Sequence, residues 1–365
     1  MCFLKYAKKS AWQSIFYLRE NAIIDRIYQM QKVFSIILLL LILPLWANFS
    51  GSAWVGIRFD SNICSLSDYD LNRFETGEKE FLLSTSDDAI TRIGGSIRYY
   101  TRLGKFRLYA NTSLWSGIYL KNSAINYLSA SGYFRIRLKG TSAQISIGGT
   151  PRYRSRAYID DDSVSTQWSE YKSFWSSCEI SQNVISQFHV SAKYKKSFYQ
   201  YCDYFPEYDS DRDEFEFAIS KSGRTSIELG YRFTNSDARG YDHAGEMKEE
   251  SDESDISYEQ DLANITLNHD FELMNLECTP EISGQFYRRL YTSIKPYWID
   301  PYHLGRTEMV WQITPSARVG FGSKMWTKLE CSFRYRRAES DFNPDIPKLR
   351  DYDRFLFSIT VGRNF

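Results

Sequence analysis

From Trp54 onward, apolar and polar residues alternate with a period of two, and no stretch keeps the period of an α-helix. In residues 355–365, for example, alternate positions on one face are mostly small or polar, and those on the other face include Phe355, Phe357 and Ile359. Such alternation predicts β-strands with one apolar and one polar face. We expect 14 of them, at about residues 54–61, 88–102, 105–119, 125–139, 142–156, 168–181, 185–199, 212–222, 225–235, 257–271, 276–291, 305–320, 325–338 and 352–365.

The connections between these strands are of two kinds, which alternate along the chain. Short turns fall at 103–104, 140–141, 182–183, 222–224, 273–275 and 322–323, and mostly longer, polar connections fall at 62–87, 120–124, 157–167, 200–211, 236–256, 292–304 and 339–351. Transmembrane barrels sort their connections in this way, with short turns at one end and long loops at the other. We therefore predict an all-β fold: a single transmembrane antiparallel up-and-down β-barrel of about 14 strands, with 12 or 16 as alternatives.

The N-terminal part has a different pattern. Residues 33–45 form the only long apolar run, preceded by Lys32 and followed by small residues at 51–53. The run is too short to cross a bilayer as a helix, and its basic, apolar, small order is that of a cleaved signal peptide. We predict cleavage after Ala53, with Ala47 as the second choice.

These observations divide the chain into three parts. Residues 1–29 are expected to be a mis-annotated or non-structural extension before a start at Met30, residues 30–53 a signal peptide, and residues 54–365 the barrel. The rival interpretation of the first part is a cytoplasmic extension ahead of a retained anchor. With an even number of strands, both termini of the barrel lie at the end with the short turns.

Composition excludes several classes of protein. Lys+Arg and Asp+Glu are equal at 45 each, so no nucleic-acid partner is expected. The mean hydropathy of -0.44 excludes a helical membrane protein but suits a barrel with a polar interior. The six cysteines have no metal-ligand spacing, and neither a cofactor nor a bound metal is expected. Only Cys64 and Cys202 fall in long loops, where they either pair or remain isolated thiols.

The closing residues resemble the C-terminal assembly signal of Gram-negative outer-membrane β-barrel proteins, which ends in alternating apolar residues and a final aromatic one. The residues that carry the resemblance are Phe357, Ile359, Val361 and Phe365, and Arg363 departs from the pattern. The resemblance implies a porin-like barrel of no identified family, recognised by the barrel assembly machinery. It also implies a location in the outer membrane among lipid and lipopolysaccharide, with both termini in the periplasm; the oligomeric state stays open.

If the apolar faces contact lipid, the opposite faces line the interior. The candidate pore-lining residues are Arg92, Arg98, Arg107, Arg135, Arg137, Arg152, Arg154, Arg156, Lys193, Glu214, Glu216, Glu228, Glu308 and Glu330. The first half contributes mainly bases and the second half more acids. This asymmetry predicts a channel for passive or weakly selective diffusion of small polar or anionic solutes. The competing interpretation is that interior charges pair with one another and fill the interior.

Two other functions are weighed against a channel. The loop 236–256 is strongly acidic and is expected to be solvated and mobile, so a non-channel barrel would be a structural, adhesive or export-associated protein that acts through its loops. An enzyme would need a histidine beside a nucleophile or a carboxylate. His189 near Ser191 and the pair Asp242-His243 lack a third placed group, so we expect no catalytic site.

Overall fold

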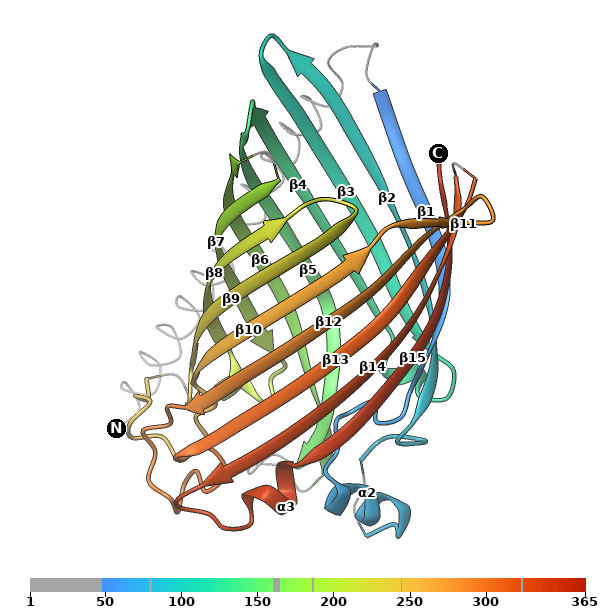
Figure 1. Ribbon diagram of the computed structural model, residues 1–365. Coiled ribbons are helices and arrows are strands. Elements are labelled where there is room, and N and C mark those ends of the chain that lie inside the picture. The colour runs from blue at the N-terminus through green and yellow to red at the C-terminus, as the bar shows by residue number, and fades with distance from the viewer. Residues whose placement is uncertain (1–47, 79–80, 160–164, 186, 244, 323) are drawn as a thin grey trace, which may run out of the picture. The chain divides into compact units, whose positions relative to one another are not determined.

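The chain forms a closed antiparallel β-barrel (Figure 1). The computed structural model describes residues 48–78, 81–159, 165–185, 187–243, 245–322 and 324–365. The strands are β1 (Asn48–Asp60), β2 (Asp88–Leu103), β3 (Phe106–Tyr119), β4 (Tyr127–Leu138), β5 (Thr141–Ile159), β6 (Thr166–Ile185), β7 (Phe188–Tyr201), β8 (Ser210–Lys221), β9 (Thr225–Ala238), β10 (Tyr258–His269), β11 (Phe271–Leu273), β12 (Leu276–Tyr291), β13 (Arg306–Phe321), β14 (Met325–Ser340) and β15 (Tyr352–Asn364).

Apart from β10 and β11, each strand pairs with its neighbour in sequence, and two further pairings close the sheet. β1 pairs with β15, and β10 pairs with β12. The three-residue β11 continues β10 beside the same partner, β12, so the described residues form a barrel of 14 strands. This confirms the predicted fold class and strand number. Closure satisfies every strand edge, which lipid cannot do.

The exterior of the wall is apolar. On β1, the side chains of Val55 and Ile57 are 49% and 62% exposed, and on β15 those of Ile359 and Val361 are 43% and 41% exposed. Similar side chains are exposed on the other long strands. A belt of exposed branched and aromatic residues around the whole wall requires lipid as its solvent, so we treat the barrel as membrane-spanning.

The two ends of the barrel differ. One end has tight turns, such as Met274–Asn275, where both residues adopt positive φ angles of 52° and 63° that suit a two-residue hairpin. The other end has the long connections, with the helices α2 (Asp68–Glu75) and α3 (Ile346–Arg350) and the single turns η1 (Ser123–Ile125) and η2 (Pro206–Tyr208). Figure 1 shows the C-terminus at the first end and α2 and α3 at the second, which we call the outer end.

One local expectation is wrong. The turn expected at 182–183 lies inside β6, which continues to Ile185 through a bulge that keeps Val184 and Ile185 in apolar exterior positions. The connections 62–87 and 339–351 contain the short helices α2 and α3. Neither α2 nor α3 is long and apolar enough to cross a bilayer.

The start of β1 bears on where a signal peptide would be removed. β1 begins at Asn48 rather than Trp54, and Ser52 pairs with Asn364. Gly51 also exchanges both backbone hydrogen bonds with Phe365, at 2.7 and 2.9 Å. Cleavage after Ala53 would remove these contacts from the seam that closes the barrel. Residues 1–47, which hold the expected extension and most of the signal peptide, lie outside the described residues.

We therefore propose cleavage after Ala47, the second of the two positions considered above. Amino-terminal sequencing of the mature protein is expected to read Asn48-Phe49-Ser50, because this start preserves the whole β1–β15 pairing. A mature chain that begins with Trp54 would contradict the proposal and would leave the end of β15 without a partner on that side.

Candidate functional site

Side chains that alternate with the exposed apolar ones point into the barrel. Arg58 of β1, for example, lies between Ile57 and Phe59, both of which are exposed on the outside. The same alternation places these predicted residues on the interior face: Arg92, Arg98, Arg107, Arg135, Arg137, Lys193, Glu214, Glu216, Glu228, Glu308 and Glu330. It also places Arg58, Arg212 and Arg354 there, which were not among the predicted pore-lining residues although they share the inward register.

Five interior arginines on β2, β3 and β4 form a surface that we call the basic arc: Arg92, Arg98, Arg107, Arg135 and Arg137. No carboxylate of the described residues lies within 4.0 Å of any of them. Arg107 and Arg137 stand opposite each other across two strands, and Arg135 donates its Nε–H to Gln144 Oε1 at 2.8 Å. Because unpaired guanidinium groups require water or anions, the basic arc indicates a hydrated interior.

The interior of β7, β8 and β9 is instead close to neutral. Lys195 contacts Glu214 at 2.8 Å, Arg232 contacts Glu216 at 2.7 Å, and Lys193 lies 4.0 Å from Glu216. Charges pair across the strands on this side, as the competing interpretation expected, but not along the basic arc. The interior is therefore asymmetric in charge.

β5 breaks the alternation, so the predicted inward placement of Arg152 and Arg154 is wrong. Register shifts on both sides of Tyr153 insert extra residues into β5 relative to β6. Tyr153 therefore points inward together with Tyr171, while Arg152 and Arg154 each contact Glu170 at 2.8 Å on the opposite face. A period-two pattern cannot anticipate the extra residues of a bulge.

Arg156, beyond the second shift, points inward at the outer end of β5. It is buried and pairs with Asp70 of α2. Ser67 caps this helix by accepting a hydrogen bond from the Asp70 backbone N–H at 3.1 Å. The Lys348 ammonium lies 4.1 Å from the ring centre of Tyr69, which links α3 to α2. Helix α2, in the connection 62–87, is thus held against the inner wall at the outer end.

Tyrosines and arginines line the outer end of the interior in a band that we call the collar: Tyr127, Tyr153, Tyr171, Tyr199, Arg212, Tyr258, Arg289, Tyr291 and Arg306. The ring centres of Tyr153 and Tyr171 are 5.3 Å apart. The Arg306 guanidinium carbon lies 3.6 Å from the ring centre of Tyr291. Stacking holds the planar guanidinium groups in fixed orientations. The alternation of apolar and polar residues does not reveal the collar, because tyrosine is compatible with either face of a strand.

Glu308 is the carboxylate at the centre of the arginines on the β12–β14 side. It is 1% exposed and lies 3.7 Å from Arg289, 3.5 Å from Arg306 and 3.8 Å from Arg336. The single negative charge of this buried carboxylate therefore partly compensates the positive charges of three arginines. This geometry makes Glu308 a structural residue of the outer end rather than a free pore-lining charge.

A cavity of about 290 Å³, which we call the outer cavity, opens between the collar and the basic arc. Its charged residues are Arg58, Arg92, Arg354 and Asp60. The remaining lining residues are Ile90, Tyr119, Tyr127, Ser129, Thr150, Tyr153, Tyr171 and Ser173. A second cavity of about 350 Å³ lies toward the short turns and includes Arg98, Arg135 and Arg137. Both cavities have a predominantly basic lining, and both leave open space in the interior of the barrel.

Glycines let aromatic rings lie flat against the interior wall. A methyl group at Gly94 would lie 2.4 Å from the Trp54 ring, and one at Gly362 would lie 2.3 Å from the Trp326 ring. Arg92 stacks over the Trp54 ring, 5.4 Å from its centre. Flat rings occupy less of the interior than rings that project into it, so these glycines keep the barrel hollow.

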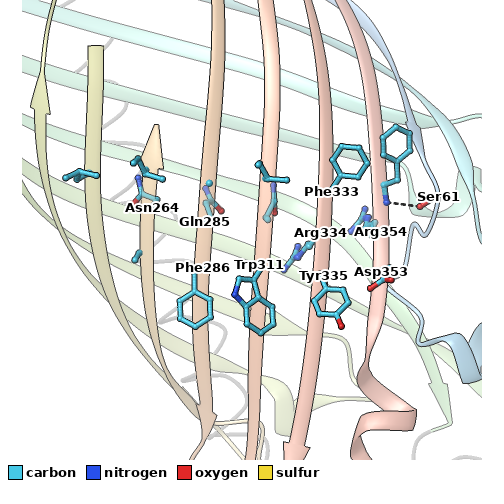
Figure 2. Close-up of a pocket in the computed structure, with 17 residues that line it drawn as sticks. Ser61, Asn264, Gln285, Phe286, Trp311, Phe333, Arg334, Tyr335, Asp353 and Arg354 are labelled. Atoms are coloured by element: carbon cyan, nitrogen blue, oxygen red, sulfur yellow. Dashed lines mark hydrogen bonds between the residues drawn. The ribbon is translucent and has the colours of Figure 1, made fainter. Parts of the chain in front are cut away.

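A larger hollow of about 910 Å³ borders the wall of β10 and β12–β15 (Figure 2). Figure 2 shows Phe286, Trp311 and Tyr335 side by side on three neighbouring strands, with ring centres 5.5 and 5.8 Å apart. These rings share the register of the exposed Ile313 and thus belong to the exterior, where aromatic residues mark the edge of a membrane. Interior residues such as Gln285, Arg334 and Arg354 line the same hollow, so its lining mixes the two faces of the wall. The outer cavity is lined from the interior face alone, and we therefore take it as the charged candidate site.

The acidic connection 236–256 was expected to be mobile, but much of it is packed. Asp255 is 0% exposed and its backbone N–H donates to Asp300 at 3.1 Å. Lys295 is 1% exposed and donates to the Ser251 carbonyl at 2.7 Å. Asp300 also contacts His303 Nδ1 at 2.7 Å. Two outer connections are thus joined through buried polar groups.

The remaining reactive residues do not form a recognisable catalytic or metal centre among the described residues. His189 Nδ1 lies 2.6 Å from the Asn183 side-chain oxygen rather than beside a carboxylate. Asp242, His243 and Glu246 cluster within 4.8 Å at the surface, an arrangement common without an ion. Cys64 and Cys202 are both free thiols.

Comparison with known proteins assigns no family. No protein-family model and no curated protein matches the chain. Similar solved structures include an anion-selective porin from Comamonas acidovorans (10% identity, TM-score 0.39, 87% of this chain and 99% of that one) and OprD from Pseudomonas aeruginosa (9%, 0.39, 87% and 94%). The toluene transporter TodX from Pseudomonas putida is another (8%, 0.39, 88% and 89%). Likeness this low carries no argument, so the fold rests on the chain's own strand pairing.

Proposed function

We propose that this chain forms an outer-membrane channel for small polar solutes, with a preference for anions. The basic arc carries the proposal: five interior arginines have no carboxylate of the described residues within 4.0 Å, in a barrel that retains two basic cavities. Rings and arcs of arginine are the usual means by which a pore selects anions. The short-turn end, where the C-terminus lies, would face the periplasm, and the long loops would face outward.

The exterior side chains support an assembly role for the last strand. Phe357, Ile359 and Val361 point outward from β15, Phe365 directly follows that strand, and all four are 37–63% exposed. A row of apolar residues that is exposed on the closing strand is available to the barrel assembly machinery, as the resemblance implies. Lipid and lipopolysaccharide would surround the same face in the membrane.

Conductance in a planar lipid bilayer tests the proposed function. We expect stable single-channel steps and a reversal potential in a KCl gradient that shows preference for chloride. The double variant Arg98→Glu/Arg135→Glu is expected to shift the reversal potential toward cations, because it reverses two interior charges.

Arg152→Glu is the matched control, because Arg152 lies on the opposite face of β5, in contact with Glu170. Its reversal potential is expected to equal that of the wild type. Absence of conductance at every voltage would contradict the proposal and favour a structural, adhesive or export-associated barrel. Unchanged ion selectivity in the double variant would show that the basic arc does not determine the preference for anions.

A further inference from the structure

We propose that the outer cavity binds a small polyhydroxylated carboxylate, such as a hexuronate. The inference rests on the proposed function, since it names a solute that the channel would pass. The outer cavity of about 290 Å³ lies inside the barrel, between the collar and the basic arc. A volume at the lower end of the range for ligand sites suits a solute of about one sugar ring.

Of the three arginines that line the outer cavity, only Arg92 has no carboxylate of the described residues within 4.0 Å. Arg354 is engaged with Asp60, to which it donates from Nε at 2.8 Å and from a second nitrogen. Arg58 forms an ion pair with Glu330 at 3.6 Å, and its buried Nε–H has no hydrogen-bond partner among the described residues. The buried Nε–H of Arg92 has no hydrogen-bond partner in this part of the chain either.

A carboxylate is the group that matches this unused donor. A guanidinium group presents parallel N–H donors that fit the two oxygens of a carboxylate, and charge-assisted bonds of this kind are the stronger ones. Arg92 is also held in place, because it stacks over the Trp54 ring, which itself lies flat on Gly94. The recognition group is therefore pre-oriented rather than flexible.

The rest of the lining favours a hydroxylated solute over an aromatic or aliphatic acid. Hydroxyl groups of Ser129, Thr150 and Ser173 border the cavity, and Ser129 and Thr150 are hydrogen-bonded to each other at 2.7 Å. Four tyrosines complete the wall, and Ile90 is the only aliphatic side chain in it. Such a wall offers donors and acceptors for the hydroxyls of a sugar, and tyrosine rings for its C–H faces.

Calorimetric titration of the purified full-length barrel in detergent tests the inference. The probes are galacturonate, galactose, inorganic phosphate and benzoate. We expect galacturonate to bind more tightly than the other three. Arg92→Gln is expected to weaken galacturonate binding about tenfold or more, the loss expected for one hydrogen bond between charged groups. Arg92→Lys keeps the charge but not the paired donors, so its galacturonate affinity should lie between those of the wild type and Arg92→Gln.

The control is Arg152→Gln, an exterior arginine whose loss should leave the galacturonate affinity unchanged. Equal affinity for galacturonate and galactose, tighter binding of phosphate or benzoate, or full affinity in both Arg92 variants would each overturn the inference. Bilayer conductance separates it from the proposed function: a conducting barrel without galacturonate preference defeats only the inference. Galacturonate binding by a barrel that does not conduct defeats the channel instead.

Discussion

Glu308→Gln is expected to lower the free energy of unfolding of the barrel by about 3–5 kcal/mol, the usual cost of removing one partner of a buried ionic group. Glu308 is 1% exposed and its carboxylate faces Arg289, Arg306 and Arg336 within 3.8 Å. A neutral amide of the same shape leaves three guanidinium groups close together without a balancing charge. Urea unfolding in detergent, followed by tryptophan fluorescence, measures the change.

Glu330→Gln is the matched control. Glu330 is also an interior glutamate, but its side chain is 26% exposed and its contacts with Arg58 and Lys328 are 3.6 and 3.2 Å long. The expected loss is about 0–1 kcal/mol, as for solvated ion pairs. Equal losses for the two variants would show that burial of Glu308 does not matter and would contradict the structural role assigned to it.

Acidification is expected to loosen the outer connection 292–304 between pH 6.5 and 4. Burial, followed by the nearby Arg306 charge, lowers the pKa of His303 from 6.5 to about 4, although Asp300 opposes this change. His303 is neutral when packed and would be protonated when released. The contribution of His303 to the stability of the packed connection is therefore complete above pH 6.5. It is lost as the pH falls toward 4, which lowers the free energy of opening by about 3 kcal/mol in all.

Other groups around His303 do not change the direction of this pH dependence. Burial alone would raise the pKa of Asp300, but hydrogen bonds from His303 and Ser293 hold it below its ordinary value, so Asp300 stays ionised through this window. Tyr291 packs 5.3 Å from the His303 ring and Arg306 stays charged. Amide hydrogen exchange of residues 292–304 at pH 7 and 4.5 measures the effect.

His303→Gln provides the control for the pH effect, because glutamine retains a donor toward Asp300 and does not titrate. Exchange of the connection should then depend much less on pH, after correction for the intrinsic exchange rate. If wild-type protein shows equal protection at both pH values, His303 is not buried in neutral form in solution. Equal pH dependence in the variant would assign the effect to another group.

Period-two alternation along the sequence determined the barrel. Alternate residues of a strand face opposite sides, so a strand with one apolar and one polar face is stable where lipid lies on one side of the wall and water on the other. It also assigned residues such as Arg98, Arg135 and Lys193 to the interior face, since a strand without bulges has no freedom to change the order of its faces. The alternation of short and long connections determined which end of the barrel has the tight turns.

Only the tertiary structure decided where that periodicity fails and what the interior charges meet. The shifts in β5 sent Arg152 and Arg154 outward and Tyr153 inward, because an unpaired residue in one strand reverses the faces that follow it. Whether an interior arginine has a partner depends on residues from distant strands. Glu308 meets Arg289 and Arg336 across neighbouring strands, whereas Arg92 meets no carboxylate of the described residues. Sequence spacing determines the face of a side chain, and strand pairing determines its neighbours.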